Sequence, residues 1–250
     1  MDQVELVSCL RALKMPCVLE YFADYSERAG KEQWSFERYL YELLNMEREN
    51  RTERRIQKLM RESKLPLGKT LDALDRTRFP RTINQQIDAL LEGSFLERYE
   101  NVLVFGNPGA GKSHAVCAIA HQLVLQGHRV VFKNCEMLVQ ELLIAKRDLA
   151  LPALLRKLRR YEALIIDDIG YVQQNREEME VLFTLLADRY ERASTMITSN
   201  LPFSKWEKIF KDPMTTAAAI DRLVHHSMIL ELNLTSYRLE QARKEKRHEE

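Results

Sequence analysis

The stretch Gly106-Asn107-Pro108-Gly109-Ala110-Gly111-Lys112-Ser113 decides the fold of this 250-residue chain. The apolar run before it, residues 101–105, predicts a buried strand. The run after it, residues 114–121, predicts the start of a helix. A strand, a glycine-rich turn and a helix in this order are the context that a phosphate-binding loop requires. A glycine-rich turn that matches by chance is the alternative, and both flanks argue against it.

The chemistry of this loop points to a nucleoside triphosphate held together with Mg²⁺. Glycines let backbone N–H groups curve around a phosphate because no Cβ is in the way, and the helix N-terminus adds the positive end of its dipole. Lys112 can reach the β- and γ-phosphates, and Ser113 can ligate Mg²⁺. We therefore expect residues 106–113, together with His114, to bind ATP and Mg²⁺.

Composition narrows the class of protein. The formal net charge is +1, although 30% of the residues are charged. No apolar run is long enough to span a bilayer, and the N-terminus lacks the basic and apolar regions of a signal peptide. The four cysteines show neither metal-ligand spacing nor a disulfide framework, and the pair His225-His226 has no further ligand at a suitable spacing. We expect a soluble cytoplasmic protein with reduced thiols and no membrane partner.

The sequence predicts two domains. Residues 1–65 carry apolar residues at helical spacing and predict a small all-α N-terminal domain. A linker starts at Leu65-Pro66-Leu67-Gly68, and residues 66–250 form the second predicted domain, which ends in a charged, frayed or disordered tail at 238–250. Short apolar, β-branched runs alternate there with helical stretches, which is typical of a parallel sheet covered on both faces. The five predicted strands are residues 101–105, 129–133, 163–167, 195–199 and 228–232.

Polar residues end the third and fourth predicted strands. Asp167 and Asp168 follow four apolar residues at the strand edge where open α/β sheets bind ligands. Asp167 is placed to hold Mg²⁺ through water, and Asp168 is the candidate base or orienter for an attacking water. Asn200 is a candidate to sense the γ-phosphate or to position that water. The alternatives are an ordinary acidic turn and a polar loop start.

Arg222 precedes the fifth predicted strand and is a candidate arginine finger. Its guanidinium could stabilise γ-phosphate charge in the site of a neighbouring subunit. The alternative is an ion pair within the chain, to Asp221 or Glu231. Arg189 and Arg192, before the fourth strand, are weaker candidates for the same interface.

Two basic helical segments are candidates for contacts with DNA phosphates. The first is a predicted helical insert at 138–161, split near Pro152. The second lies in the N-terminal domain. Both could instead be solvated helix faces, but paired cationic helices suit the tracking of a phosphate backbone. The candidate DNA-binding residues are Lys146, Arg147, Arg156, Lys157, Arg159 and Arg160 in the insert, and Arg51, Arg54, Arg55 and Lys58 in the N-terminal domain.

These motifs together resemble a known family. The phosphate-binding loop, Asp-Asp-Ile-Gly-Tyr at 167–171, Thr-Ser-Asn-Leu-Pro-Phe at 198–203 with Trp206, and Asp-Arg-Leu at 221–223 look like those of the IstB-like ATP-binding proteins. These are the transposition helper ATPases of insertion sequences, belong to the AAA+ class and are close kin of the DnaC helicase loaders. The resemblance covers nearly the whole chain, and the second and third motifs are its most specific parts.

The resemblance implies an AAA+ P-loop NTPase fold that assembles as a ring or spiral on double-stranded DNA and uses ATP to control an IstA-like transposase. It implies that Lys112 and Ser113 bind phosphates and Mg²⁺, that Asp167 binds the metal, that Asn200 is a sensor and that Arg222 acts in trans. It also places the 138–161 insert along DNA. Two departures stand out. Asp168 replaces the longer Glu of many AAA+ ATPases, and we expect no full helical lid whose sensing residue could be Arg238.

Three other functions compete with this interpretation. A helicase loader would share every nucleotide-binding motif, and a preference for single-stranded DNA would favour it. A small-molecule P-loop kinase would need a substrate pocket and lid, and the sensor Asn200 with Arg222 argues against it. A nucleotide-gated DNA scaffold that barely hydrolyses ATP remains open because Asp168 is short.

Overall fold

The computed structural model describes residues 3–170, 176–202, 205–206 and 213–237. Within it the chain forms two compact units, Met1–Lys58 and Leu59–Glu250. Tyr171 and Phe203 of the sequence motifs, and the tail 238–250 with Arg238, lie outside the described residues. In the described part of the chain, no helix is both long enough and apolar enough to cross a membrane.

The N-terminal unit is all-helical. It contains α1 (Gln3–Ala12), α2 (Pro16–Lys31) and most of α3 (Phe36–Ser63), around a small core of Leu10, Val18 and Leu43. The last turn of α3 belongs to the second unit, because Leu59 is buried in that unit's core. The division between the two compact units falls between residues 58 and 59, within α3.

A buried carboxylate from α3 caps the N-terminus of α2. The N-cap residue Met15 offers no side-chain hydrogen bond to the helix. Glu47 does so instead: its Oε2 accepts from the backbone N–H groups of Cys17, at 2.9 Å, and Val18, at 3.3 Å. Arg51 donates to Oε1 of the same carboxylate at 2.8 Å. Burial raises the pKa of Glu47, but these hydrogen bonds outweigh it and hold the pKa below its ordinary value.

Glu47→Gln should therefore destabilise the protein at neutral pH and hardly at all in acid. The lowered pKa means that ionised Glu47 stabilises the folded state above its unfolded pKa, about 4.3, and that this contribution disappears as pH falls through the folded value. We expect a loss of about 1–2 kcal/mol near pH 7. Urea unfolding followed by far-ultraviolet circular dichroism at several pH values measures it. A difference from wild type that does not shrink as the pH falls well below the unfolded pKa would contradict the capping role.

The second unit is a three-layer α/β domain. Its parallel sheet has the order β2-β3-β4-β1-β5, so the predicted five-stranded parallel sheet is confirmed. The strands are β1 (Asn101–Gly106), β2 (Val130–Asn134), β3 (Ala163–Ile169), β4 (Ser194–Ser199) and β5 (Ser227–Leu232). The helices are η1 (Arg76–Arg78), α4 (Arg81–Leu91), α5 (Ser94–Glu97), α6 (Lys112–Leu125), α7 (Cys135–Arg147), α8 (Leu151–Leu158), α9 (Arg176–Arg189) and α11 (Pro213–Val224).

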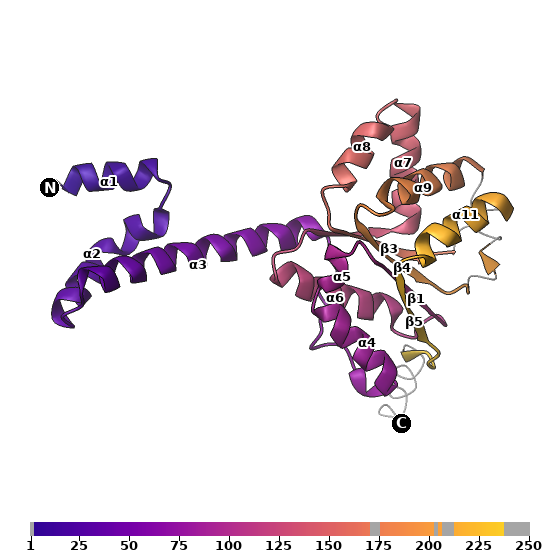
Figure 1. Cartoon of the computed structure of the whole chain (residues 1–250), viewed down its shortest axis with the longest axis horizontal. Helices are drawn as coiled ribbons and strands as arrows, with labels where there is room; N and C mark the ends of the chain where they lie inside the picture. The colour runs from indigo at the N-terminus through magenta and orange to yellow at the C-terminus, as the bar shows by residue number, and fades with distance from the viewer. Residues whose placement is uncertain (1–2, 171–175, 203–204, 207–212, 238–250) are drawn as a thin grey trace, which may run out of the picture. The chain divides into compact units, whose positions relative to one another are not determined.

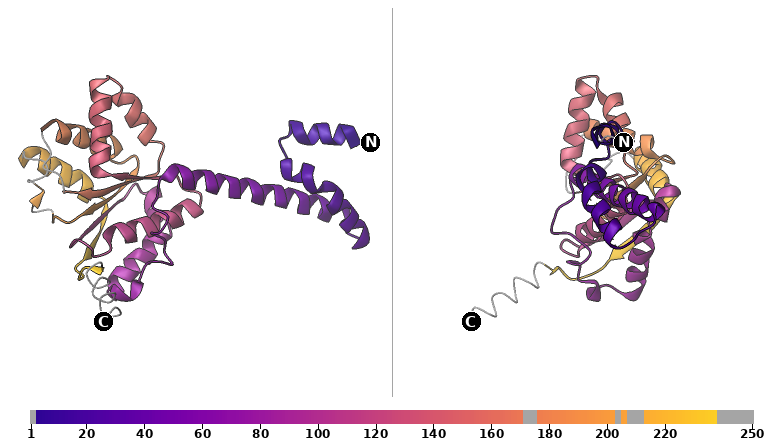
Figure 2. Two further views of the ribbon diagram at one scale, coloured as in Figure 1. Left: turned by 180° about the vertical axis from the view of Figure 1, so that it is seen from behind. Right: turned by 90° about the vertical axis from the view of Figure 1, so that its left-hand side faces the viewer.

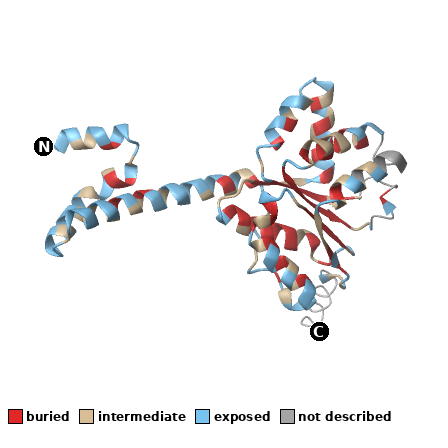
Figure 3. Cartoon of the chain, viewed as in Figure 1, coloured by how far each residue is buried: buried red, intermediate tan, exposed pale blue. Residues whose placement is uncertain are grey.

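Helices cover both faces of this sheet, as its apolar strands require. One core contains the buried side chains of α4 and α6, and the other those of α7 and α9 with Leu223 of α11. Figure 1 and its reverse view in Figure 2 show the helical layers on either side of the strands. The three central strands, β3, β4 and β1, are buried along nearly their whole length (Figure 3). The loops at their carboxyl ends are therefore held on a rigid base.

The segment predicted as a basic insert is the crossover between β2 and β3. Helix α7 packs on the sheet through Leu138 and Leu142, which are fully buried, so it forms part of the domain core rather than an addition to it. The chain breaks after Arg147, and α8 begins with Pro152 in its first turn, where proline is compatible with a helix. The predicted split near Pro152 is confirmed.

All four cysteines are free. Cys9 is exposed on α1, while Cys17, Cys117 and Cys135 are buried. Burial raises the pKa of Cys117 to about 12, and burial likewise raises the pKa of Cys17. These buried thiols stay protonated at neutral pH and are poor nucleophiles.

Candidate nucleotide-binding site

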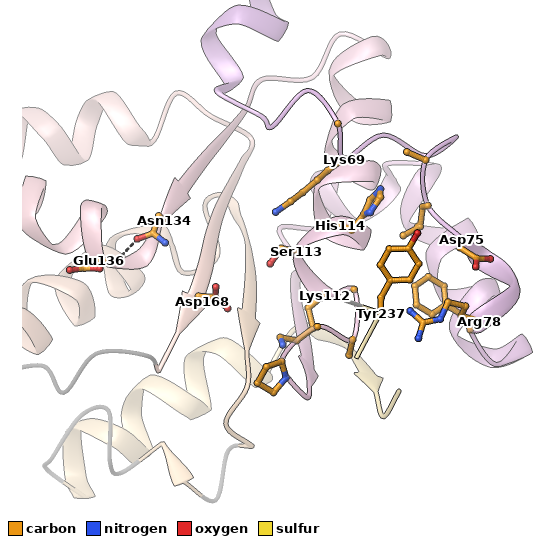
Figure 4. A pocket seen from close by; sticks show the side chains of 18 residues that line it. Lys69, Asp75, Arg78, Lys112, Ser113, His114, Asn134, Glu136, Asp168 and Tyr237 are labelled. Atoms are coloured by element: carbon orange, nitrogen blue, oxygen red, sulfur yellow. Dashed lines mark hydrogen bonds between the residues drawn. The ribbon is translucent and has the colours of Figure 1, made fainter. Parts of the chain in front are cut away.

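The phosphate-binding loop joins β1 to α6 and lines a pocket of about 650 Å³ (Figure 4). Two of its glycines cannot carry a side chain. A Cβ on Gly106 would lie 2.3 Å from the carbonyl oxygen of Leu232, and one on Gly109, whose φ is +79°, would lie 2.2 Å from Oγ of Ser236. Glycine at these positions lets the loop lie close to the end of β5 and to the segment that follows it.

The start of α6 is prepared for an anion. The helix begins at Lys112, and the N-cap Gly111 provides no side-chain acceptor for the first N–H groups. Lys112 is only 5% exposed, and its Nζ donates to the carbonyl oxygens of Gly106, at 2.9 Å, and Asn107, at 3.0 Å. A buried ammonium and uncapped helix N–H groups at one end of a pocket fit the phosphates of a nucleotide.

The opposite wall of the pocket comes from a segment that sequence reasoning missed. Residues 68–79 contribute Lys69, Asp75, Arg78 and Phe79, and Tyr237 joins them from beyond β5. Arg78 donates to the carbonyl oxygen of Thr235 at 3.0 Å, and its guanidinium lies 5.1 Å from the centre of the Tyr237 ring. This wall is both aromatic and basic, which suits a purine and its phosphates. Arg78 and Thr235 are 157 positions apart, so no local sequence pattern could reveal their contact.

One backbone hydrogen bond and one side-chain contact tie this wall to the loop and to α6. The N–H of Tyr237 donates to the carbonyl oxygen of Gly109 at 3.0 Å. His114, predicted to bind the nucleotide, lines the pocket, and its Nε2 is also 3.0 Å from the carbonyl oxygen of Thr70. Its ring therefore anchors the 68–79 segment to α6.

The acidic pair at the end of β3 is split by an irregularity in the strand. The register between β3 and β4 shifts between Ile166 and Ile169, and Asp168 has a left-handed φ of 62°. As a result Asp168 lines the pocket, across from Ser113 in Figure 4. A non-glycine residue in this conformation costs about 1 kcal/mol or more and is typical of functional sites.

Asp167 is buried behind Asp168 and held by the neighbouring strand. Its Oδ1 accepts a hydrogen bond from Thr198 at 2.6 Å, and the same hydroxyl accepts from the N–H of Asp168 at 2.8 Å. Its Oδ2 makes no hydrogen bond to any residue that the structure describes. Mg²⁺ prefers hard oxygen ligands, so an oriented carboxylate with one oxygen not used in a hydrogen bond fits the predicted role of Asp167 in Mg²⁺ binding.

Asn200 and Arg222 each bury a polar atom without a partner among the described residues. For Asn200 this atom is Oδ1, and for Arg222 it is Nη1. The predicted alternative for Arg222, an ion pair to Asp221 or Glu231, is not present in the described part of the chain. Its guanidinium lies instead 4.9 Å from the centre of the Phe183 ring. Unpaired buried donors and acceptors are costly, so such atoms point to a missing ligand or partner.

The weaker finger candidate Arg189 is wrong. Its side chain is 1% exposed and donates to the carbonyl oxygens of Leu158, at 2.9 Å, Tyr161, at 3.1 Å, and Ser194, at 2.7 Å. Burial lowers its pKa to about 10, so it remains charged at neutral pH. Arg189 fastens the end of α8 to the starts of β3 and β4 and cannot reach another subunit.

The basic residues of the crossover differ in whether they form ion pairs within the chain. Arg159 is paired with Asp188 through a hydrogen bond of 2.9 Å, and Lys146 with Glu180 at 2.9 Å. Within the described residues, the side chains of Arg147, Arg156, Lys157 and Arg160 make no ion pair. The last three lie with Arg159 around a shallow surface hollow at α8, well apart in sequence from the phosphate-binding loop. These cations face solvent because Leu155 and Leu158 hold the helix to the core.

The candidate DNA-binding residues of the N-terminal unit are also partly engaged. Arg51 donates to Glu47 and, at 2.7 Å, to the carbonyl oxygen of Lys14. Arg55 and Lys58 have interactions of their own. Arg54 makes no ion pair with a described residue. More of the candidate cations on α3 than on α8 are therefore engaged with other groups.

Comparison with known sequences gives a consistent family. The family model described as IstB-like ATP binding protein matches residues 8–245. An insertion sequence ATP-binding protein of Sinorhizobium fredii (strain NBRC 101917 / NGR234) is 41% identical over 248 residues, covering 99% of this chain and 83% of the relative. The IS21 ATP-binding protein of Pseudomonas aeruginosa is 37% identical over 240 residues, covering 96% and 91%.

Comparison with solved structures gives the fold. The DnaC helicase loader aligns with a TM-score of 0.57 at 17% identity, covering 66% of this chain and 97% of the loader. AMPPCP-bound DnaA from Aquifex aeolicus aligns with a TM-score of 0.57 at 16% identity, covering 75% and 56%. Both are AAA+ P-loop proteins, so the predicted AAA+ fold is confirmed.

Proposed function

Because the chain belongs to the family of IstB-like ATP-binding proteins, we propose that it is a Mg²⁺-dependent ATPase that assembles on double-stranded DNA and regulates a partner transposase. The single observation that carries the proposal is the unpaired buried Nη1 of Arg222 in a chain whose own pocket it does not line. An arginine finger that acts in the site of a neighbouring subunit would have an unpaired guanidinium in the isolated chain.

Each part of the site has a role in this proposal. Lys112 and the N–H groups of the loop bind the β- and γ-phosphates, while the wall of Arg78, Phe79 and Tyr237 holds the base. Ser113 and Asp167 hold Mg²⁺, which supplies charge neutralisation on the phosphate oxygens. Asp168 orients the attacking water and accepts its proton.

Two further residues complete hydrolysis in this proposal. Asn200 accepts a hydrogen bond from the attacking water through its buried Oδ1, or senses the γ-phosphate by donating from its amide NH₂ group. Arg222 of one subunit stabilises developing charge in the site of the next. The requirement for a second subunit makes hydrolysis dependent on assembly, and the proposed assembly is a ring or spiral on DNA.

The relatives favour a role in transposition over helicase loading. The relatives that match nearly the whole chain are named for insertion sequences, whereas the helicase loader shares the fold at 17% identity. A preference for single-stranded over double-stranded DNA in binding assays would reverse this choice.

We expect α8 to hold DNA by charge rather than by base recognition. Replacing Arg156, Lys157 and Arg160 with alanine should weaken binding to unrelated duplexes and reduce the log–log salt slope by about three units, one for each lost phosphate contact. ATP binding should persist, because these residues do not line the nucleotide pocket. Fluorescence anisotropy with labelled duplexes over a salt series measures both quantities.

The matched control removes charge from the N-terminal unit. Arg54→Ala with Lys58→Ala should change affinity less than the α8 variant does. If instead the α8 variant binds as wild type does, while this control loses binding, DNA contacts the N-terminal unit and the proposed DNA surface is wrong.

A further inference from the structure

Three potential metal ligands meet at the edge of the sheet opposite the nucleotide pocket. Glu191 lies in the turn between α9 and β4, and His225 and His226 lie between α11 and β5. One ligand atom from each side chain falls within 4.8 Å of the other two, and all three residues are exposed. The sequence shows the histidine pair but not its third partner, which is 34 positions away from His225.

From this cluster we propose that Glu191, His225 and His226 bind a Zn²⁺ ion, with water as the fourth ligand. Two imidazoles, one carboxylate and a water are a familiar tetrahedral set for this ion. Mg²⁺ and Ca²⁺ prefer oxygen ligands throughout, so the two nitrogens select a transition metal. In a tetrahedral site the ligand atoms lie about 3.4 Å apart, and rotation of exposed side chains supplies the small contraction needed.

The three side chains are not paired with one another. No hydrogen bond or ion pair between them is found within the described residues, although ionised carboxylates and imidazoles readily pair. The imidazole rings of His225 and His226 lie edge to face with centroids 4.2 Å apart. The hydroxyl of Tyr190 is 3.3 Å from Nδ1 of His225 and also hydrogen-bonds the Glu191 carboxylate, so it can orient both ligands. Such outer contacts position the ligands of metal sites. Nε2 of His225 makes no hydrogen bond with a described residue.

The backbone that carries these ligands is fixed by a buried asparagine. The N–H of Asn101 donates to the carbonyl oxygen of His226 at 2.7 Å. The Asn101 side chain accepts from the N–H of Thr195 at 2.9 Å and donates to the carbonyl oxygen of Leu223 at 3.2 Å. Asn101 therefore ties the end of α11 to the start of β4, next to the turn that holds Glu191. A site whose two halves are already joined loses little entropy on binding a metal.

A metal here would also act on Arg222. His225 continues the last turn of α11, since its N–H donates to the carbonyl oxygen of Asp221 at 3.0 Å. Zn²⁺ would join that turn to the α9–β4 turn and stiffen the helix end that presents Arg222. This consequence rests on the proposed function, whereas metal binding itself does not.

The test is zinc binding by the untagged full chain without nucleotide. All proteins carry Cys9→Ser, because the exposed thiol is a competing zinc ligand. Competition with a chromophoric zinc indicator should give one Zn²⁺ per chain, and Co²⁺ should give the visible absorption of a tetrahedral site. His225→Ala, His226→Ala and Glu191→Gln should each weaken binding about tenfold or more. Zn²⁺ should raise the melting temperature of the parent protein and not of these variants.

His128→Ala is the matched control. His128 pairs with Glu162 at 2.7 Å, so it offers an imidazole and a carboxylate without the third ligand. It should bind zinc as the parent does. Absence of stoichiometric zinc binding, or binding that survives loss of all three proposed ligands, overturns the proposal. ATP binding should be equal in every variant, so a failure of the ATPase assignment would appear separately.

Discussion

Arg222→Ala should lower ATP hydrolysis about 10³-fold or more and leave nucleotide binding unchanged. The guanidinium lies over Phe183 with Nη1 buried and unpaired within the described residues, so its removal breaks no ion pair of its own chain. Its effect should therefore fall on the neighbouring site. Steady-state turnover with saturating DNA, beside titration with a fluorescent ATP analogue, separates the two effects. Arg98→Ala, which removes an exposed arginine paired with Glu100, should turn over ATP as wild type does.

Mixing subunits tests whether Arg222 acts in trans. Lys112→Ala should lose nucleotide binding because the phosphates lose their buried ammonium. A mixture of this variant with Arg222→Ala should recover part of the activity, since some interfaces combine an intact site with an intact finger. If no ratio recovers activity, and circular dichroism shows both variants folded, Arg222 does not act across an interface.

Asp168→Asn should slow hydrolysis on the order of 10²-fold or more while ATP binding persists. The amide keeps the shape of the carboxylate but cannot accept a proton. Asparagine is also among the few residues that tolerate the left-handed backbone at this position, φ 62°, so the bulge in β3 should be retained. Single-turnover assays separate the chemical step from product release. DNA complexes formed in ATP should live longer.

Asp75→Asn is the control for this variant. Asp75 lines the opposite wall of the same pocket and caps η1, a role that asparagine fills equally well. Turnover of Asp75→Asn should stay within a few fold of wild type. Equal turnover of Asp168→Asn and wild type would mean that another group activates the water.

Local sequence patterns predicted the parts of the site whose residues are adjacent in the sequence to a predicted strand. The loop at 106–113 and the acids ending β3 lie next to the strands that expose them, so strand and motif could be read together. The order of the strands was not predictable, because alternation of strands and helices fixes a parallel sheet but not which strands are neighbours. The bulge that turns Asp168 toward the pocket also has no pattern of its own, since it arises from pairing with β4.

The missed features depend on contacts between distant segments. Tyr237 reaches the loop through Gly109, and Arg78 reaches the chain beyond β5. Arg189 looks like a surface residue in a helical pattern, and only the fold surrounds its guanidinium with three carbonyl groups. Glu191 approaches the histidine pair for the same reason. Composition and periodicity carry no information about such meetings.

The distribution of the cysteines makes this protein simple to label with a fluorophore. Maleimides react with thiolates that solvent can reach, which Cys9 offers and the buried thiols of Cys17, Cys117 and Cys135 do not. A dye on native protein is therefore confined to α1. It reports on the N-terminal unit, while a fluorescent nucleotide reports on the other unit. Energy transfer between the two dyes can then measure, in real time and in a single molecule, the distance between them before and after ATP and DNA are added.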